Sequence, residues 1–164
     1  MKNKKRIRII FLAFVLFAGA FAFVQWRNAQ QKGEIERYVY PTDFSDCLAI
    51  TRKQKCRIPE EILSEMSVEE LVWAVIDYPF LYEVLCSSRF PGGISEWAAG
   101  ISDAFKKLTE CRNPENKIIK VLKQACEEEG EDNSNVSLAR FVFCDGQGQY
   151  FNFSKKQLKF LKGN

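Results

Sequence analysis

Residues 58–79 have the sequence IPEEILSEMSVEELVWAVIDYP, and this stretch decides the fold. Pro59 is followed by Glu60 and Glu61. Proline and acids are typical of the first turn of a helix, where the helix dipole favours negative charge. We therefore predict a short helix that begins near Pro59 and ends near Met66.

A second helix is predicted to begin at Ser67. Ser67 and Glu70 have the spacing of a capping box, in which each side chain accepts a hydrogen bond from the other residue's backbone N–H. Met66 and Leu71 occupy the positions of a hydrophobic staple. Pro79 disfavours the helical conformation of the residue before it, so the helix should end there. Its apolar stripe contains Leu71, Val72, Val75 and Ile76.

Two longer helices are predicted to follow. The first spans residues 94–109, after the break at residues 90–93, and the second begins at Asn113-Pro114-Glu115, a cap, proline and acid in succession. Apolar residues recur at three- and four-residue steps in both. They are Ile94, Trp97, Ile101, Phe105 and Leu108 in the first, and Ile118, Val121, Leu122, Ala125 and Cys126 in the second.

The C-terminal part has a mixed pattern. Residues 127–135 are acidic and polar, which predicts a loop, and residues 145–148 (DGQG) predict a turn. Residues 136–144 fit either a helix or a strand. Ser154 and Gln157 form a second capping box, so a last helix should run to Lys162.

These patterns predict an all-α fold. We expect a bundle of about five to seven short helices after an N-terminal hydrophobic signal or anchor helix. A short strand or hairpin near residues 138–153 is the alternative for that stretch.

Part of this pattern resembles a known group of proteins. The motifs are RIPEEIL (residues 57–63), Met66-Ser67, Glu70-Leu71 and Asp77-Tyr78-Pro79, followed by a helix with Trp97 and Phe105. They resemble a helical segment of uncharacterised exported proteins of Gram-positive gut bacteria, over roughly residues 57–125. Because these are capping and packing residues, the resemblance implies a fold and an exported domain, and no activity or site residue.

Residues 1–27 predict export. A basic segment precedes residues 9–24, which contain no charged or polar side chain. This order is typical of a cleavable signal peptide or an uncleaved signal anchor, and the small residues Ala20 and Ala22 offer cleavage after Ala22. Both alternatives leave the N-terminus inside and the rest outside, because the cations precede the apolar run. The basic residues are Lys2, Lys4, Lys5, Arg6 and Arg8.

The remaining chain forms one domain by its length. We assign residues 1–27 to the signal peptide or signal-anchor helix, residues 28–57 to a linker, and residues 58–164 to a helical extracytoplasmic domain. Five of the 24 basic residues precede Phe23 and all 21 acids follow it, so a product that starts at Phe23 carries a net charge of −2. Nucleic acid is therefore disfavoured as a partner, since phosphate binding needs clustered positive charge.

The chain has six cysteines, all after the apolar run. An even number in an exported domain predicts disulfides, and buried free thiols are the alternative. Zinc is disfavoured because the chain contains no C-x-x-C pair and no histidine. The candidates are Cys47, Cys56, Cys86, Cys111, Cys126 and Cys144.

No residue pattern predicts catalysis. The absence of histidine removes the usual base of a nucleophile–base pair. Paired carboxylates could hydrolyse glycosides, although acids in these helices are also expected on solvated faces and in first turns. The acidic residues 127–132 lack the spacing of a calcium loop. We expect no metal and no cofactor. The candidate acids are Glu60, Glu61, Glu65, Glu69, Glu70, Glu83 and Glu96.

Two further groups of side chains have alternative interpretations. Lysines of the last helix could contact an anionic wall polymer or lipid headgroups, or they could complement the helix dipole. Trp73 and Trp97 could pack in the core or bind a sugar or peptide. The lysines are Lys155, Lys156, Lys159 and Lys162.

The sequence therefore favours a non-enzymatic interaction or structural protein, exported or surface-anchored, whose partner is a protein or another component of the cell envelope. A carboxylate-dependent extracytoplasmic hydrolase and a cell-wall or membrane-surface binder are the alternatives.

Overall fold

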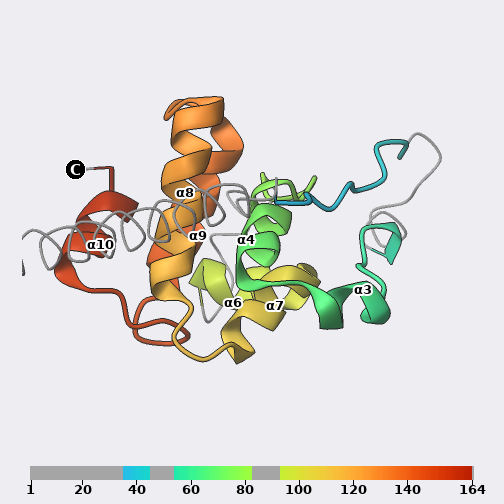
Figure 1. Ribbon diagram of the computed structural model, residues 1–164, viewed down its shortest axis with the longest axis horizontal. Helices are drawn as coiled ribbons and strands as arrows, with labels where there is room; N and C mark the ends of the chain where they lie inside the picture. The colour runs from blue at the N-terminus through green and yellow to red at the C-terminus, as the bar shows by residue number, and fades with distance from the viewer. Residues whose placement is uncertain (1–34, 45–53, 83–92, 164) are drawn as a thin grey trace, which may run out of the picture. The chain divides into compact units, whose positions relative to one another are not determined.

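The computed structural model describes residues 35–44, 54–82 and 93–163 (Figure 1). Its helices belong to the compact unit Glu36–Asn164. The described residues form helices and no strand, which confirms the all-α prediction. The predicted signal or anchor helix at residues 1–27 lies outside the described residues. The helices are α3 (Glu60–Glu65), α4 (Val68–Ile76), α6 (Gly93–Ile101), α7 (Asp103–Glu110), α8 (Glu115–Glu129), α9 (Ser134–Asp145) and α10 (Lys155–Leu161).

Helix α4 is the centre of the packing. It contacts α7, α8 and α9, and all six residues from Leu71 to Ile76 are buried. The sequence predicted one apolar stripe, but Trp73 and Ala74 are buried as well, so this helix has no solvent face along these residues. A helix that is apolar all round is stable only when its neighbours cover every side.

Both predicted capping boxes are confirmed. Ser67 Oγ accepts a hydrogen bond from the Glu70 backbone N–H at 3.2 Å, and Glu70 Oε2 accepts one from the Ser67 N–H at 2.6 Å. Ser154 and Gln157 make the same reciprocal pair at the start of α10. These bonds satisfy backbone donors that have no partner within the helix.

The single helix predicted over residues 94–109 is wrong, because the chain forms α6 and α7 with a break at Ser102. Ser102 has an extended backbone (φ −104°, ψ 112°), and its side chain accepts a hydrogen bond from the Phe105 N–H. Ser102 therefore caps a new helix, although the apolar periodicity of the sequence runs through this position without interruption. The break also changes the buried face of α6, which presents Ser95 and Ala98 to the core and leaves Trp97 half-buried.

Residues 134–145 form α9, which resolves the choice between helix and strand. Asn133 caps this helix by accepting hydrogen bonds from the N–H groups of Asn135 and Val136. The loop predicted over residues 127–135 is too long, because α8 continues to Glu129. The hairpin alternative near residues 138–153 is also wrong: among the described residues this stretch has only an isolated bridge between Gln147 and Phe151.

The end of α9 is tied to the start of α6. Asp145 Oδ2 accepts a hydrogen bond from the Ser95 N–H at 2.9 Å. Gly93 begins α6 with φ of +87°, and a Cβ atom at this position would lie 2.9 Å from the same oxygen. Both the backbone conformation and the close approach therefore require glycine.

An aromatic cluster joins α7, α9 and the turn after α9. The rings of Phe105, Phe143 and Phe151 contact one another, with centroids 5.6 to 5.8 Å apart. All three side chains are buried. Such ring pairs add about 0.5–1.5 kcal/mol beyond the burial of their area.

We predict that Phe105→Ala lowers the free energy of unfolding by about 3–5 kcal/mol, because it leaves a cavity among packed rings. The matched control is Phe141→Ala, since Phe141 is 47% exposed on α9. Urea unfolding followed by circular dichroism measures both. Equal losses in the two variants would contradict the assignment of Phe105 to the core.

Candidate functional site

Arg37 fixes an N-terminal segment, residues 36–42, to the helical core. Its Nε donates a hydrogen bond to Asp77 Oδ2 at 2.8 Å, and its Nη2 bonds Asp77 Oδ1 and lies 2.7 Å from Glu129 Oε1. Its guanidinium carbon lies 4.1 Å from the centroid of the Trp73 ring. One side chain therefore joins this segment to the C-terminal ends of α4 and α8.

The charge of Arg37 is held in place by these partners. The hydrogen bond to Asp77 raises the pKa of Arg37 above its usual value, against the opposing effect of partial burial, and Glu129 adds to the increase. The guanidinium thus stays protonated and pairs with two carboxylates. Lysine would not reproduce this combination of paired N–H donors and a delocalised cation over the Trp73 ring.

Tyr40 makes the second attachment of this segment. Its hydroxyl donates a hydrogen bond to the Ala74 carbonyl oxygen at 3.0 Å, and its ring lies 5.6 Å from that of Tyr78. Burial raises the pKa of Tyr40, so the phenol stays neutral and remains a donor. Tyr38, two residues earlier, packs its ring 4.9 Å from Tyr40, so both rings lie on one side of the segment.

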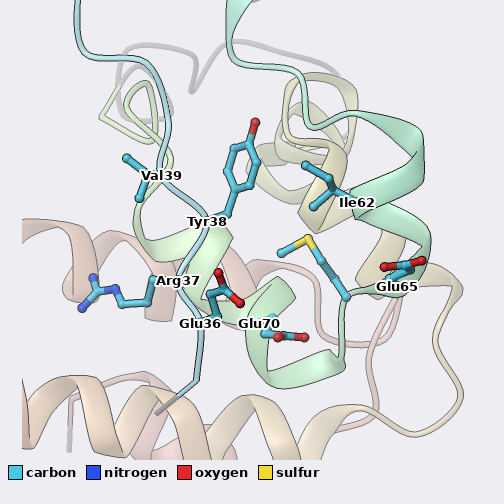
Figure 2. Close-up of a pocket in the computed structure, with 8 residues that line it drawn as sticks. Glu36, Arg37, Tyr38, Val39, Ile62, Glu65 and Glu70 are labelled. Atoms are coloured by element: carbon cyan, nitrogen blue, oxygen red, sulfur yellow. The ribbon is translucent and has the colours of Figure 1, made fainter. Parts of the chain in front are cut away.

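A groove of about 500 Å³ lies between this segment and helices α3 and α4 (Figure 2). Figure 2 shows Tyr38 entering it from the segment and Ile62 from α3, whereas Arg37 points away. The lining thus combines apolar side chains with carboxylates. Its lining residues are Glu36, Arg37, Tyr38, Val39, Ile62, Glu65, Met66 and Glu70.

The carboxylates that line the groove differ in hydrogen bonding and in exposure. Glu70 is occupied by the capping box, since its carboxylate accepts the Ser67 N–H. Glu36 and Glu65 are exposed. A general acid active at neutral pH needs desolvation of its carboxyl group, which exposed positions do not supply. The groove is therefore suited to attract positive charge more than to catalyse proton transfer.

Two of the predicted candidate acids, Glu65 and Glu70, meet at the groove. Glu69 points elsewhere and accepts a hydrogen bond from Lys117 Nζ at 3.0 Å. Although partial burial alone would raise the pKa of Glu69, this hydrogen bond lowers it overall. Glu60 and Glu61 lie in the first turn of α3 and Glu96 in that of α6. Glu83 lies outside the described residues.

No cluster of three or more cysteine or acidic side chains among the described residues could hold a metal ion. The described helices include none with the length and apolar composition to cross a bilayer.

The prediction of disulfides is not supported by the described cysteines. Cys56, Cys111, Cys126 and Cys144 are free thiols. They belong to different parts of the fold, and an even number of cysteines does not bring any two within bonding distance. Burial raises the pKa of Cys56 and of Cys126. Cys47 and Cys86 lie outside the described residues.

The lysines of α10 are all exposed, as an anionic surface would require. On the side facing α9, Arg140 donates to the Phe160 carbonyl oxygen and lies over its ring. Wall or lipid binding by this helix stays a prediction. The four lysines are Lys155, Lys156, Lys159 and Lys162.

The two tryptophans differ. Trp73 is buried in the core, where it also supports Arg37. Trp97 is half-buried on α6.

The sequence pattern missed the segment that completes the groove. Residues 36–39 (ERYV) fell within the predicted linker, because a stretch this short has no usable periodicity. The sequence feature that could have indicated this segment is the pair Tyr38 and Tyr40 next to Arg37. Aromatic residues two positions apart are typical of an extended chain with one buried side.

No protein-family model, curated protein or solved structure matches this chain. The resemblance to exported proteins of Gram-positive gut bacteria stays a prediction.

We predict that Arg37→Met releases the segment from α4 and α8, because it leaves Asp77 and Glu129 without their shared cation. Chymotrypsin should then cleave after Tyr38 about tenfold faster, since cleavage follows the population of the open segment. Lys107→Met is the control, because Lys107 pairs with Glu110 at 3.7 Å on the surface. Equal cleavage rates in the wild type and Arg37→Met would contradict the role of Arg37.

We also predict that Cys56, Cys111, Cys126 and Cys144 are alkylated by iodoacetamide after unfolding without reductant. In the folded protein at neutral pH, Cys56 should react slowest, because it is 2% exposed and its raised pKa reduces the thiolate fraction. Its reaction should accelerate as the pH rises. Peptide mass spectrometry measures each site, and modification that requires reductant would contradict the assignment of free thiols.

Proposed function

We propose that this chain is a non-enzymatic interaction protein displayed outside the cytoplasm, and that the groove between residues 36–39 and α3 is its binding surface. The observation that carries the proposal is the combination of exposed apolar side chains and exposed acids around one hollow. Val39 is 85% exposed and Ile62 is 45% exposed, and both line the groove. Covering such side chains on binding is favourable by roughly 25 cal/mol per Å².

Export is supported by the N-terminal sequence. Five basic residues precede the apolar run at residues 9–24, an order that directs the following chain across the membrane. The segment either anchors the domain to the membrane or is removed near Ala22. The acidic charge of the remaining chain favours a protein or envelope partner over nucleic acid.

A carboxylate-dependent hydrolase is the second candidate. The observation in its favour is that Glu36 and Glu65 line the same groove. A glycosidase needs two carboxyl groups on either side of the bond that it cleaves, one of them shielded from water. The exposure of both side chains favours binding over catalysis.

The test places a photoreactive benzophenone residue at Val39 in the full chain and irradiates intact cells. We expect a discrete crosslinked adduct, because this side chain lies at the proposed interface. The same residue at the exposed Phe141 of α9 is the matched control and should give no such adduct. A membrane-impermeant protease added to the cells should digest the domain.

The absence of the Val39 adduct would overturn the proposal, and so would either of two further results. One is glycan or peptide turnover by the purified chain that Glu65→Gln abolishes and Glu61→Gln does not, which would make it an enzyme. The other is a domain that survives the protease until the membrane is permeabilised.

A further inference from the structure

The backbone of residues 36–42 is open to a partner. Within the part of the chain that the structure describes, no backbone hydrogen bond joins these residues to another segment. Only side chains hold them, chiefly Arg37 and Tyr40. An exposed, extended segment with unpaired N–H and C=O groups is a template for a further strand.

We propose that the groove binds an extended peptide segment rich in lysine or arginine, which pairs with the backbone of residues 36–39 as an added strand. This inference rests on the proposed function and names the chemistry of its partner. Strand addition combines two kinds of recognition: main-chain hydrogen bonds supply affinity, and contacts with alternate side chains supply specificity.

Charge favours a basic peptide over other extended partners. Glu36 and Glu65 are exposed at the groove, and the one basic side chain of its lining, Arg37, is already paired with Asp77 and Glu129. A cationic side chain therefore meets unbalanced carboxylates, whereas an acidic peptide would be repelled.

The apolar residues suit a peptide whose basic and apolar residues alternate. Val39 belongs to the segment and Ile62 to α3, and Met66 lines the groove at the C-terminal end of α3. Methionine adapts its shape to different apolar partners. Successive side chains of an extended peptide point to opposite sides, so apolar residues enter the groove, and the long flexible stems of the neighbouring lysines or arginines reach around the peptide to the exposed carboxylates.

The experiment measures binding of fluorescein-labelled octapeptides to the full chain in detergent by fluorescence anisotropy. One probe alternates lysine and valine, and a control alternates glutamate and valine. Two further probes carry N-methyl groups on the odd or the even residues of the lysine peptide, which blocks backbone pairing along one edge without any change to the protein.

We expect only the lysine peptide to bind, and one of the two N-methylated forms to bind about tenfold more weakly, because its main-chain hydrogen bonds are lost. Glu65→Gln should weaken binding about threefold to fivefold, and added salt should reduce the difference. Glu61→Gln, on the same helix and outside the groove lining, should bind like the wild type. Ile62→Lys should abolish binding, and Phe141→Lys is its control.

Four outcomes would overturn this inference. Equal affinity for the lysine and glutamate peptides would refute the charge argument, and equal affinity of both N-methylated probes would refute strand addition. Concentration-dependent dimers that Val39→Lys dissociates would assign the groove to a second copy of the chain. If the Val39 crosslink forms in cells while no peptide binds, this inference fails and the proposed function stands. If neither the crosslink nor peptide binding is observed, both this inference and the proposed function fail.

Discussion

Burial of α4 on every side is the constraint on which the rest of the structure depends. Residues 71–76 leave no face for water, so α7, α8 and α9 must all pack against this helix. The capping box at Ser67 fixes where it begins, and Pro79 follows soon after its end. The order of the helices around the core follows from covering this one apolar segment.

The groove exists because Arg37 attaches its segment to the same core from outside. The guanidinium uses Trp73, a residue of the buried helix, as its support, and the carboxylates of Asp77 and Glu129 as its partners. Held at this side, the segment presents Tyr38 to the hollow beside α3. The shape of the groove thus depends on an ion pair whose arginine side chain points away from it (Figure 2).

The sequence predicted helices best where a side chain fixes a boundary. Both capping boxes are local hydrogen-bond patterns and were found from residue spacing alone. Periodicity failed at Ser102, because a serine that caps a helix and one within a helix occupy the same place in an apolar pattern. The cysteines show the same limit. The number of cysteines in a sequence does not tell which of them lie close together in the folded chain.

By itself, the sequence determined the all-α class and the capped starts of α4 and α10, and it marked acids of α3 and α4 as candidates, because each rests on neighbours within one or two helical turns. Only the tertiary structure decided that Glu36 and Val39 join them. Their segment has no periodic signal, and the partners of Arg37 lie 40 and 92 residues away in the sequence. Long-range pairing of this kind is specified by the packed surface that receives it.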